Sequence, residues 1–118
     1  MKVKINSVEY EIIEVTQKEY KTYRKEEYEV LECKKEDLTE GIYYGATHSF
    51  TNKIFLSKEQ PSDRKRKTLI HELTHAYINE YVVHQDKNYD EEMVADIVAN
   101  SYDIIHNIVD NYFKKGKW

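Results

Sequence analysis

The amino-acid sequence predicts an α+β fold, in which a small antiparallel β-sheet packs on two long helices. Two observations support this prediction. Short alternating apolar segments, separated by turn residues, occupy roughly the first half of the chain, and two long segments with apolar residues at helical spacing follow them. A chain of 118 residues has the usual size for one hydrophobic core, so residues 1–118 are expected to form a single domain.

The first strands are predicted as a hairpin. Residues 3–5 and 8–12 alternate between apolar and polar on either side of residues 6–7, which are Asn and Ser. The stretch that follows is rich in Lys and Glu, and we expect a helix over residues 18–24 and a strand over residues 28–33.

A second hairpin is expected before residue 60. Gly41 and Gly45 bracket the apolar residues 42–44, which form its first strand, and residues 54–57 form its returning strand. An extended peptide could add to the sheet along residues 54–56 if that strand lies at an exposed edge.

Two long helices are predicted in the second half of the chain. The first covers residues 63–83, after Pro61, and the second covers residues 89–113, with Asn88 as its N-cap. Each carries an apolar stripe at helical spacing. The first stripe is Leu69, Ile70, Leu73, Ala76 and Tyr77, and the second is Val94, Ile97, Val98, Ser101, Ile105, Ile108 and Tyr112.

The most informative motif is the HExxH sequence at residues 71–75, inside the first long helix. His71 and His75 lie four residues apart, so both imidazoles point to one face and can bind one metal ion. Glu72 is then placed to hold and deprotonate the attacking water. Neutral imidazoles with an open coordination position favour Zn²⁺ in a catalytic role.

A catalytic zinc site of this type needs a third protein ligand. Glu92 and Asp96 lie one turn apart on the second helix, where Glu92 can bind the metal and Asp96 can accept the outer N–H of a ligating histidine. Glu91 is an alternative ligand, but no acidic residue follows it one turn later to support a ligating histidine. Its negative charge can also simply interact with the positive N-terminal end of the helix. His84 is a further alternative.

These motifs resemble those of the gluzincin metallopeptidases, and more narrowly those of the small ImmA/IrrE-type metallopeptidases. The similarity rests on residues 68–75, TLIHELTH, and on residues 92–99, EMVADIVA. The resemblance implies zinc ligation by His71, His75 and Glu92, a general base at Glu72, and cleavage of a protein or peptide substrate that is often a regulatory protein.

Composition narrows the possible partners. The formal net charge is −4, which disfavours nucleic acid or an anionic membrane as the main partner. Cys33 is the lone cysteine, so no internal disulfide forms, and we expect a cytoplasmic monomer. A basic run at residues 64–67 either coats the start of the first long helix or forms a docking patch for an acidic partner.

Several further residues are weaker candidates. His48 could approach the metal cleft from the second hairpin, whereas His106 lies about 21 Å from Glu92 along the second helix and is too distant to be a ligand. One of four tyrosines could donate to the oxyanion, namely Tyr43, Tyr44, Tyr89 or Tyr102. The alternative function is a zinc-binding regulatory or adaptor protein of the same fold, but the presence of Glu72 beside the ligands favours an enzyme.

Overall fold

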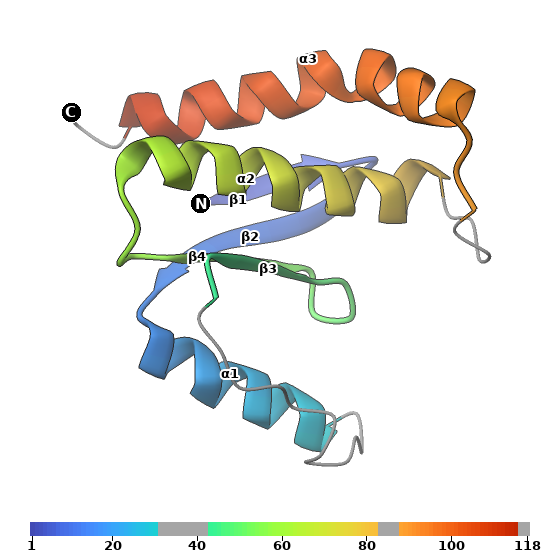
Figure 1. Ribbon diagram of the computed structural model, residues 1–118. Coiled ribbons are helices and arrows are strands. Elements are labelled where there is room, and N and C mark those ends of the chain that lie inside the picture. The colour runs from blue at the N-terminus through green and yellow to red at the C-terminus, as the bar shows by residue number, and fades with distance from the viewer. Residues whose placement is uncertain (31–42, 83–87, 116–118) are drawn as a thin grey trace.

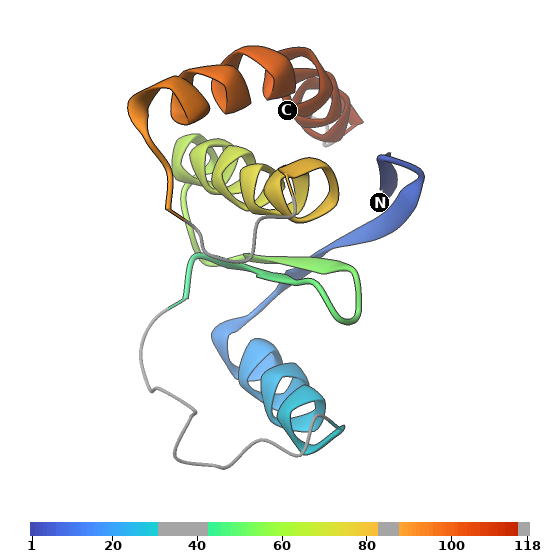
Figure 2. The same cartoon turned by 90° about the vertical axis from the view of Figure 1, so that its right-hand side faces the viewer.

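The computed structural model describes residues 1–30, 43–82 and 88–115. Its strands and helices follow one another in this order: β1 (Lys2–Ile5), β2 (Val8–Val15), α1 (Gln17–Val30), β3 (Gly45–His48), β4 (Lys53–Ser57), α2 (Ser62–Tyr77), the π-helical segment η2 (Ile78–Val82) and α3 (Glu91–Lys115). α2 lies between the sheet and α3, and α1 lies on the opposite side of the sheet (Figures 1 and 2). The predicted α+β class is confirmed.

The sheet has four strands in the order β1-β2-β4-β3. β1 pairs with β2 and β3 pairs with β4 in antiparallel fashion, as two hairpins should. The two hairpins join through a parallel pair, in which Glu11 lies opposite Lys53 and Val15 opposite Ser57. The sheet is therefore mixed, and the expectation of a wholly antiparallel sheet is wrong, because the chain crosses over after β2 through α1 before it returns to the sheet.

The first hairpin is confirmed at its predicted position. Asn6 and Ser7 have φ values of 50° and 68°, the left-handed conformation that a two-residue turn of this type requires at both positions. The returning strand of the second hairpin is also confirmed, as β4. Its first strand was misplaced, since β3 occupies residues 45–48 and not residues 42–44, of which residue 42 lies outside the described residues.

The helix predicted over residues 18–24 is confirmed, as part of α1. Thr16 and Glu19 form a capping box at its start, with Thr16 N donating to Glu19 Oε1 (2.9 Å) and Glu19 N donating to Thr16 Oγ1 (3.1 Å). The helix continues to Val30, so the strand predicted over residues 28–33 is wrong for residues 28–30, while residues 31–33 lie outside the described residues.

The core lies mainly between the sheet and α2. Leu69, Leu73 and Ala76 of α2 are completely buried, as the predicted stripe requires, and they face Ile54 and Leu56 of β4 across the same core cluster. The helical segment predicted to reach residue 83 changes to π-helix at Ile78, and Val83 lies outside the described residues.

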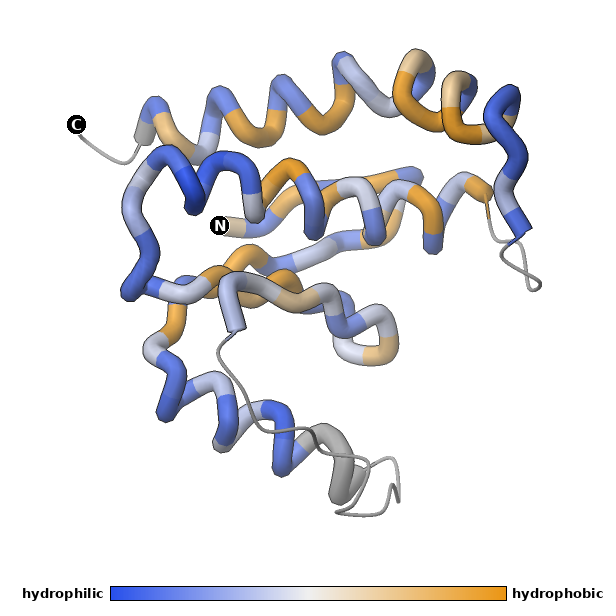
Figure 3. Tube along the Cα trace, in the orientation of Figure 1, coloured by the Kyte–Doolittle hydropathy of each residue, from blue (hydrophilic) through white to orange (hydrophobic). Residues whose placement is uncertain are grey.

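Most of the predicted apolar stripe of α3 is confirmed, since Ile97, Ile108 and Tyr112 pack against the core that includes α2. Ser101, Ile105, Val109 and Phe113 are buried, and Figure 3 shows apolar residues along the side of α3 that faces α2. Val94 and Val98 are 50% and 60% exposed, so the predicted stripe is wrong at these two positions. The N-cap is also different from the predicted Asn88. Asp90 Oδ1 accepts a hydrogen bond from Met93 N (2.8 Å).

Two ion pairs of α2 tie its first turns to the rest of the fold. Lys65 Nζ lies 2.7 Å from Glu14 Oε1 of β2, and Tyr112 of α3 donates to the other oxygen of Glu14. Burial raises the pKa of Glu14, but the hydrogen bonds from Lys65 and Tyr112 outweigh burial and hold the pKa below its usual value. Arg66 pairs with Asp110 of α3 at 2.7 Å. Within the described parts of the chain, none of the helices is both long and apolar enough to cross a membrane.

Candidate metal centre

His71 and His75 come together on the exposed face of α2. Their Nε2 atoms are 3.2 Å apart, and the ring centroids are 4.9 Å apart with the planes 75° to each other. Two nitrogen ligands at 2.0–2.1 Å from a tetrahedral zinc ion are separated by about 3.3 Å. The spacing of the two nitrogens therefore fits one shared zinc ion.

Glu72 points from α2 toward the sheet, and its side chain is 8% exposed. Its Oε2 atom lies 4.0 Å from His71 Nε2, so the carboxylate stands beside the histidine pair. Thr47 of β3 holds the other oxygen, because its Oγ1 lies 2.9 Å from Glu72 Oε1 and 3.0 Å from the Glu72 main-chain carbonyl oxygen. Thr47 was not identified from the sequence. The strand was expected at residues 42–44, which gave no reason to expect the side chain of residue 47 to face α2.

Gly45 permits β3 to lie this close to α2. A Cβ atom at residue 45 would be 2.6 Å from Thr68 Cγ2 and 3.1 Å from both Glu72 Cγ and the Phe55 carbonyl oxygen. A side chain at this position would therefore collide with the helix at the turn that carries Glu72. The absence of a side chain at Gly45 is part of how the site is built.

An open groove runs along α2 beside β3 and ends at His71 and Glu72. Its lining residues are Tyr43, Tyr44, Gly45, Arg64, Lys67, Thr68, His71 and Glu72. We refer to it below as the β3 groove. Of the four tyrosines considered for oxyanion binding, Tyr43 and Tyr44 line it, whereas Tyr102 is a 56% exposed residue of α3.

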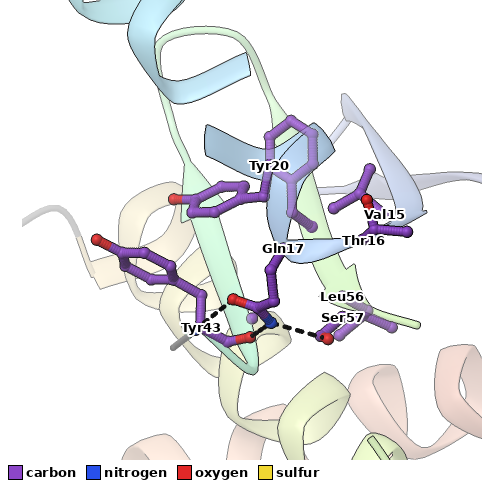
Figure 4. Close-up of a pocket in the computed structure, with 9 residues that line it drawn as sticks. Val15, Thr16, Gln17, Tyr20, Tyr43, Leu56 and Ser57 are labelled. Carbon is purple, nitrogen blue, oxygen red and sulfur yellow. Dashed lines mark hydrogen bonds between the residues drawn. The ribbon is translucent and has the colours of Figure 1, made fainter. Parts of the chain in front are cut away.

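The segment that enters β3 is anchored from the other side of the sheet by Gln17 of α1. Gln17 Oε1 accepts from Tyr43 N (2.9 Å), and Gln17 Nε2 donates to Tyr43 O (2.5 Å) and to Ser57 Oγ (3.0 Å), as Figure 4 shows. The side-chain amide thus pairs with the backbone of residue 43 as a neighbouring strand would. Tyr43 is also one of the residues that line the β3 groove.

His48 lies on the face of the sheet opposite the histidine pair. Its Nε2 is 2.9 Å from the Tyr20 hydroxyl, and its ring packs against Phe55 with centroids 5.0 Å apart. Burial, followed by the positive charges of Arg24 and Lys53, lowers the pKa of His48. His48 therefore belongs to the contact between α1 and the sheet, and the expectation that it might approach the metal cleft is wrong. The more distant His106 stacks on Tyr102 of α3, with ring centroids 3.9 Å apart.

Glu91 and Glu92 stand in the first turn of α3, exposed to solvent, and Asp96 follows one turn later. Asp96 lines a second groove, between α3 and η2, together with Tyr77, Tyr81 and Met93. Among the residues that the structure describes, no three His, Cys, Asp or Glu side chains form a group that could hold a metal. The structure therefore brings His71 and His75 together but does not place Glu92 with them, and the alternative ligand His84 lies outside the described residues.

The predicted edge for peptide addition needs correction. β4, which contains residues 54–56, lies between β2 and β3, so both of its edges are already paired. Among the strands that the structure describes, β3 is the edge strand beside β4, and its Gly45 lines the β3 groove together with His71 and Glu72.

Comparison with known proteins identifies a family for this chain. The family model for peptidase M78, described as the IrrE N-terminal-like domain, matches residues 26–104. This range contains β3, β4, α2 and the first half of α3, and hence every residue of the candidate centre. No curated protein and no solved structure matches the chain. Because the match covers about two thirds of the chain, this protein belongs to the peptidase M78 family and is a metallopeptidase-like domain.

Proposed function

We propose that this protein is a zinc-dependent endopeptidase that hydrolyses peptide bonds of a protein substrate. His71, His75 and Glu92 are its zinc ligands, and Glu72 is its general base. The observation that carries the proposal is the 3.2 Å spacing of the two histidine nitrogens with the Glu72 carboxylate beside them. Membership of a peptidase family supports the same chemistry.

Glu72 is suited to move the proton in this reaction. When bound, zinc polarises the scissile carbonyl and lowers the pKa of water toward about 7. Glu72 accepts the proton of the attacking water and returns it to the departing amine. Thr47 orients the carboxylate by holding Oε1, which leaves Oε2 on the side of His71.

Glu92 and Asp96 complete the proposed centre from α3. Glu92 supplies the carboxylate that the histidine pair lacks, and Asp96 accepts the outer N–H of a ligating histidine. Zinc binding is then expected to join α2 to the first turn of α3, because ligands from two helices share one ion. Metal binding should accordingly stabilise the fold.

The substrate is proposed to bind as an extended peptide along the outer edge of β3. An edge strand offers unpaired N–H and C=O groups to an incoming strand, and the β3 groove leads that strand to Glu72. Main-chain pairing requires no particular sequence, so side chains that line the groove must supply selectivity.

The deciding experiment compares zinc-loaded wild type with zinc-loaded Glu72→Gln in a proteome-wide cleavage assay of host lysate. The wild type should produce new peptide termini. Glu72→Gln should bind zinc normally but cleave about 10²–10⁴-fold more slowly. Identical termini from both proteins, or none from either, would favour the zinc-binding adaptor over the enzyme.

The ligand set is tested by zinc content and thermal unfolding of single variants. His71→Ala, His75→Ala and Glu92→Ala should each lose zinc and the stabilisation that zinc provides. Glu91→Ala and His106→Ala are matched controls that remove the same side-chain types from α3 and should keep one zinc per chain. Full zinc occupancy in Glu92→Ala would exclude Glu92 as a ligand.

A further inference from the structure

The four basic side chains at residues 64–67, at the start of α2, point to two different parts of the structure. Lys65 pairs with Glu14 and Arg66 pairs with Asp110, each at 2.7 Å, so these two cations bind carboxylates of the fold itself. Arg64 and Lys67 line the β3 groove instead. This division follows from the helix, because residues 64, 67 and 71 recur at intervals of three and four and share one face.

The described part of the β3 groove is therefore lined mainly by positive charge. Among the described residues that line it, Glu72 carries the one negative charge, and its carboxylate is held by Thr47. The guanidinium of Arg64 lies 4.7 Å from the centroid of the Tyr44 ring, which places this cation against the wall of the groove. Lys67 is exposed one turn before His71.

From this arrangement we infer that the β3 groove selects substrates with an acidic side chain, Asp or Glu, bound by Arg64 and Lys67 on one side of the scissile bond. The inference rests on the proposed peptidase function and names its substrate preference. A carboxylate is the peptide group that can pair with both cations, and a guanidinium can bind it through two parallel hydrogen bonds.

The position of the acidic residue follows from helix and strand dimensions. Along the α2 axis, Lys67 precedes His71 by about 6 Å and Arg64 precedes it by about 10 Å. An extended peptide advances about 3.4 Å per residue. The acidic side chain should therefore lie two or three residues from the bond that is cleaved. Both cations precede His71, so the preference should appear on one side of that bond and be absent from the other.

The test uses synthetic decapeptides built on a sequence that the zinc-loaded wild type cleaves in the lysate assay. Glu is placed at each position in turn, with Gln at the same position as its isosteric neutral control. At the selected position, Glu should raise kcat/KM about threefold to tenfold over Gln, and added salt should reduce this advantage. Lys67→Gln and Arg64→Gln should each diminish the ratio, whereas Arg66→Gln removes an equal charge from the neighbouring position and should leave it unchanged.

A charge reversal tests direct contact. Lys67→Glu should prefer Lys over Glu at the same substrate position, a result that a general change in stability cannot produce. The inference is overturned if wild type cleaves Glu and Gln peptides equally at every position, or if Arg66→Gln alters the ratio as much as Lys67→Gln does. Either result leaves the peptidase assignment intact.

A binding measurement separates the inference from the proposed function. Fluorescent decapeptide pools with Glu or Gln fixed at one position are titrated into zinc-loaded Glu72→Gln protein and followed by anisotropy. One Glu pool should bind more tightly than its Gln counterpart, and Lys67→Gln should abolish this difference. That result would support recognition of an acidic side chain even if the wild type cleaved no peptide. Equal binding of all Glu and Gln pools would refute it.

Discussion

Substitution of Gly45 by alanine tests whether the close approach of β3 to α2 positions the site. The added Cβ would lie 2.6 Å from Thr68 Cγ2, a separation at which one of the two groups must move. Overpacking of this kind costs about 1–3 kcal/mol. Because φ of Gly45 is not positive, alanine can adopt the same backbone conformation. Alanine also lowers the conformational entropy of the unfolded chain, which offsets about 0.4–1 kcal/mol of the loss. The net loss should be about 1–2 kcal/mol, or about 4–8 °C in Tm for a domain of this size.

The collision can be relieved from the other side. Thr68→Ser removes the Cγ2 methyl and keeps the hydroxyl that donates to Gln60 Oε1 (2.9 Å). Gly45→Ala combined with Thr68→Ser should recover about 1 kcal/mol relative to the sum of the single changes. Recovery should be incomplete, because the Phe55 carbonyl oxygen remains 3.1 Å from the new Cβ. Thr22→Ser makes the same replacement on α1 and should give no recovery.

Calorimetry of the metal-free proteins measures these differences without the contribution of bound zinc. Peptidase activity of zinc-loaded Gly45→Ala should also fall, because the Cβ presses on Glu72 Cγ at 3.1 Å. If Gly45→Ala were as stable as wild type, or if Thr22→Ser rescued it as well as Thr68→Ser, the close packing of β3 on α2 would not be the constraint described above.

Three further predictions concern Thr47, Asp96 and His48. Thr47→Val keeps the shape of the side chain but removes the hydrogen bond to Glu72, so kcat should fall about tenfold at unchanged zinc content, and Thr47→Ser should retain the wild-type rate. Asp96→Ala should weaken zinc binding about 10–100-fold in a chelator competition, and unchanged affinity would exclude its support of a ligand. The pKa of His48 is lowered from 6.5 in the folded state, so the unfolded state binds more protons and stability should fall as the pH drops below 6.5. The urea midpoint of unfolding, measured from about pH 5 to 7, should therefore change less with pH in His48→Gln than in the wild type. The same change with pH in both proteins would contradict this prediction.

Local features were predictable because short-range geometry determines them. The pairing of His71 with His75 follows from helical spacing, and the turn at Asn6 and Ser7 follows from residue types that tolerate positive φ. The burial of Leu69 and Leu73 follows from the same helical periodicity.

Features that depend on distant segments were not predictable. Nothing in residues 11–15 specifies a parallel partner at residues 53–57, because either direction satisfies alternating apolar strands. The role of Thr47 depends on the register of β3, which was misplaced by three residues at its start. Val94 and Val98 are exposed although Ile97 between them packs against the core, because the sequence of α3 alone does not determine which side of the helix faces α2. The assembly of Glu92 with the histidines stays a prediction.

The parallel pairing of β2 with β4 has a consequence for the order in which the protein folds. His48 and Lys53 are 5 residues apart across the β3–β4 turn, whereas Glu11 and Lys53 are 42 residues apart across the parallel pair. Closing the longer loop costs about 2 kcal/mol more in chain entropy. Each hairpin can therefore form early from local contacts, and their union should be the slow step. Mutations in the parallel pair of β2 and β4, such as Ile12→Val and Ile54→Val, should slow refolding more than equally destabilising changes in α3.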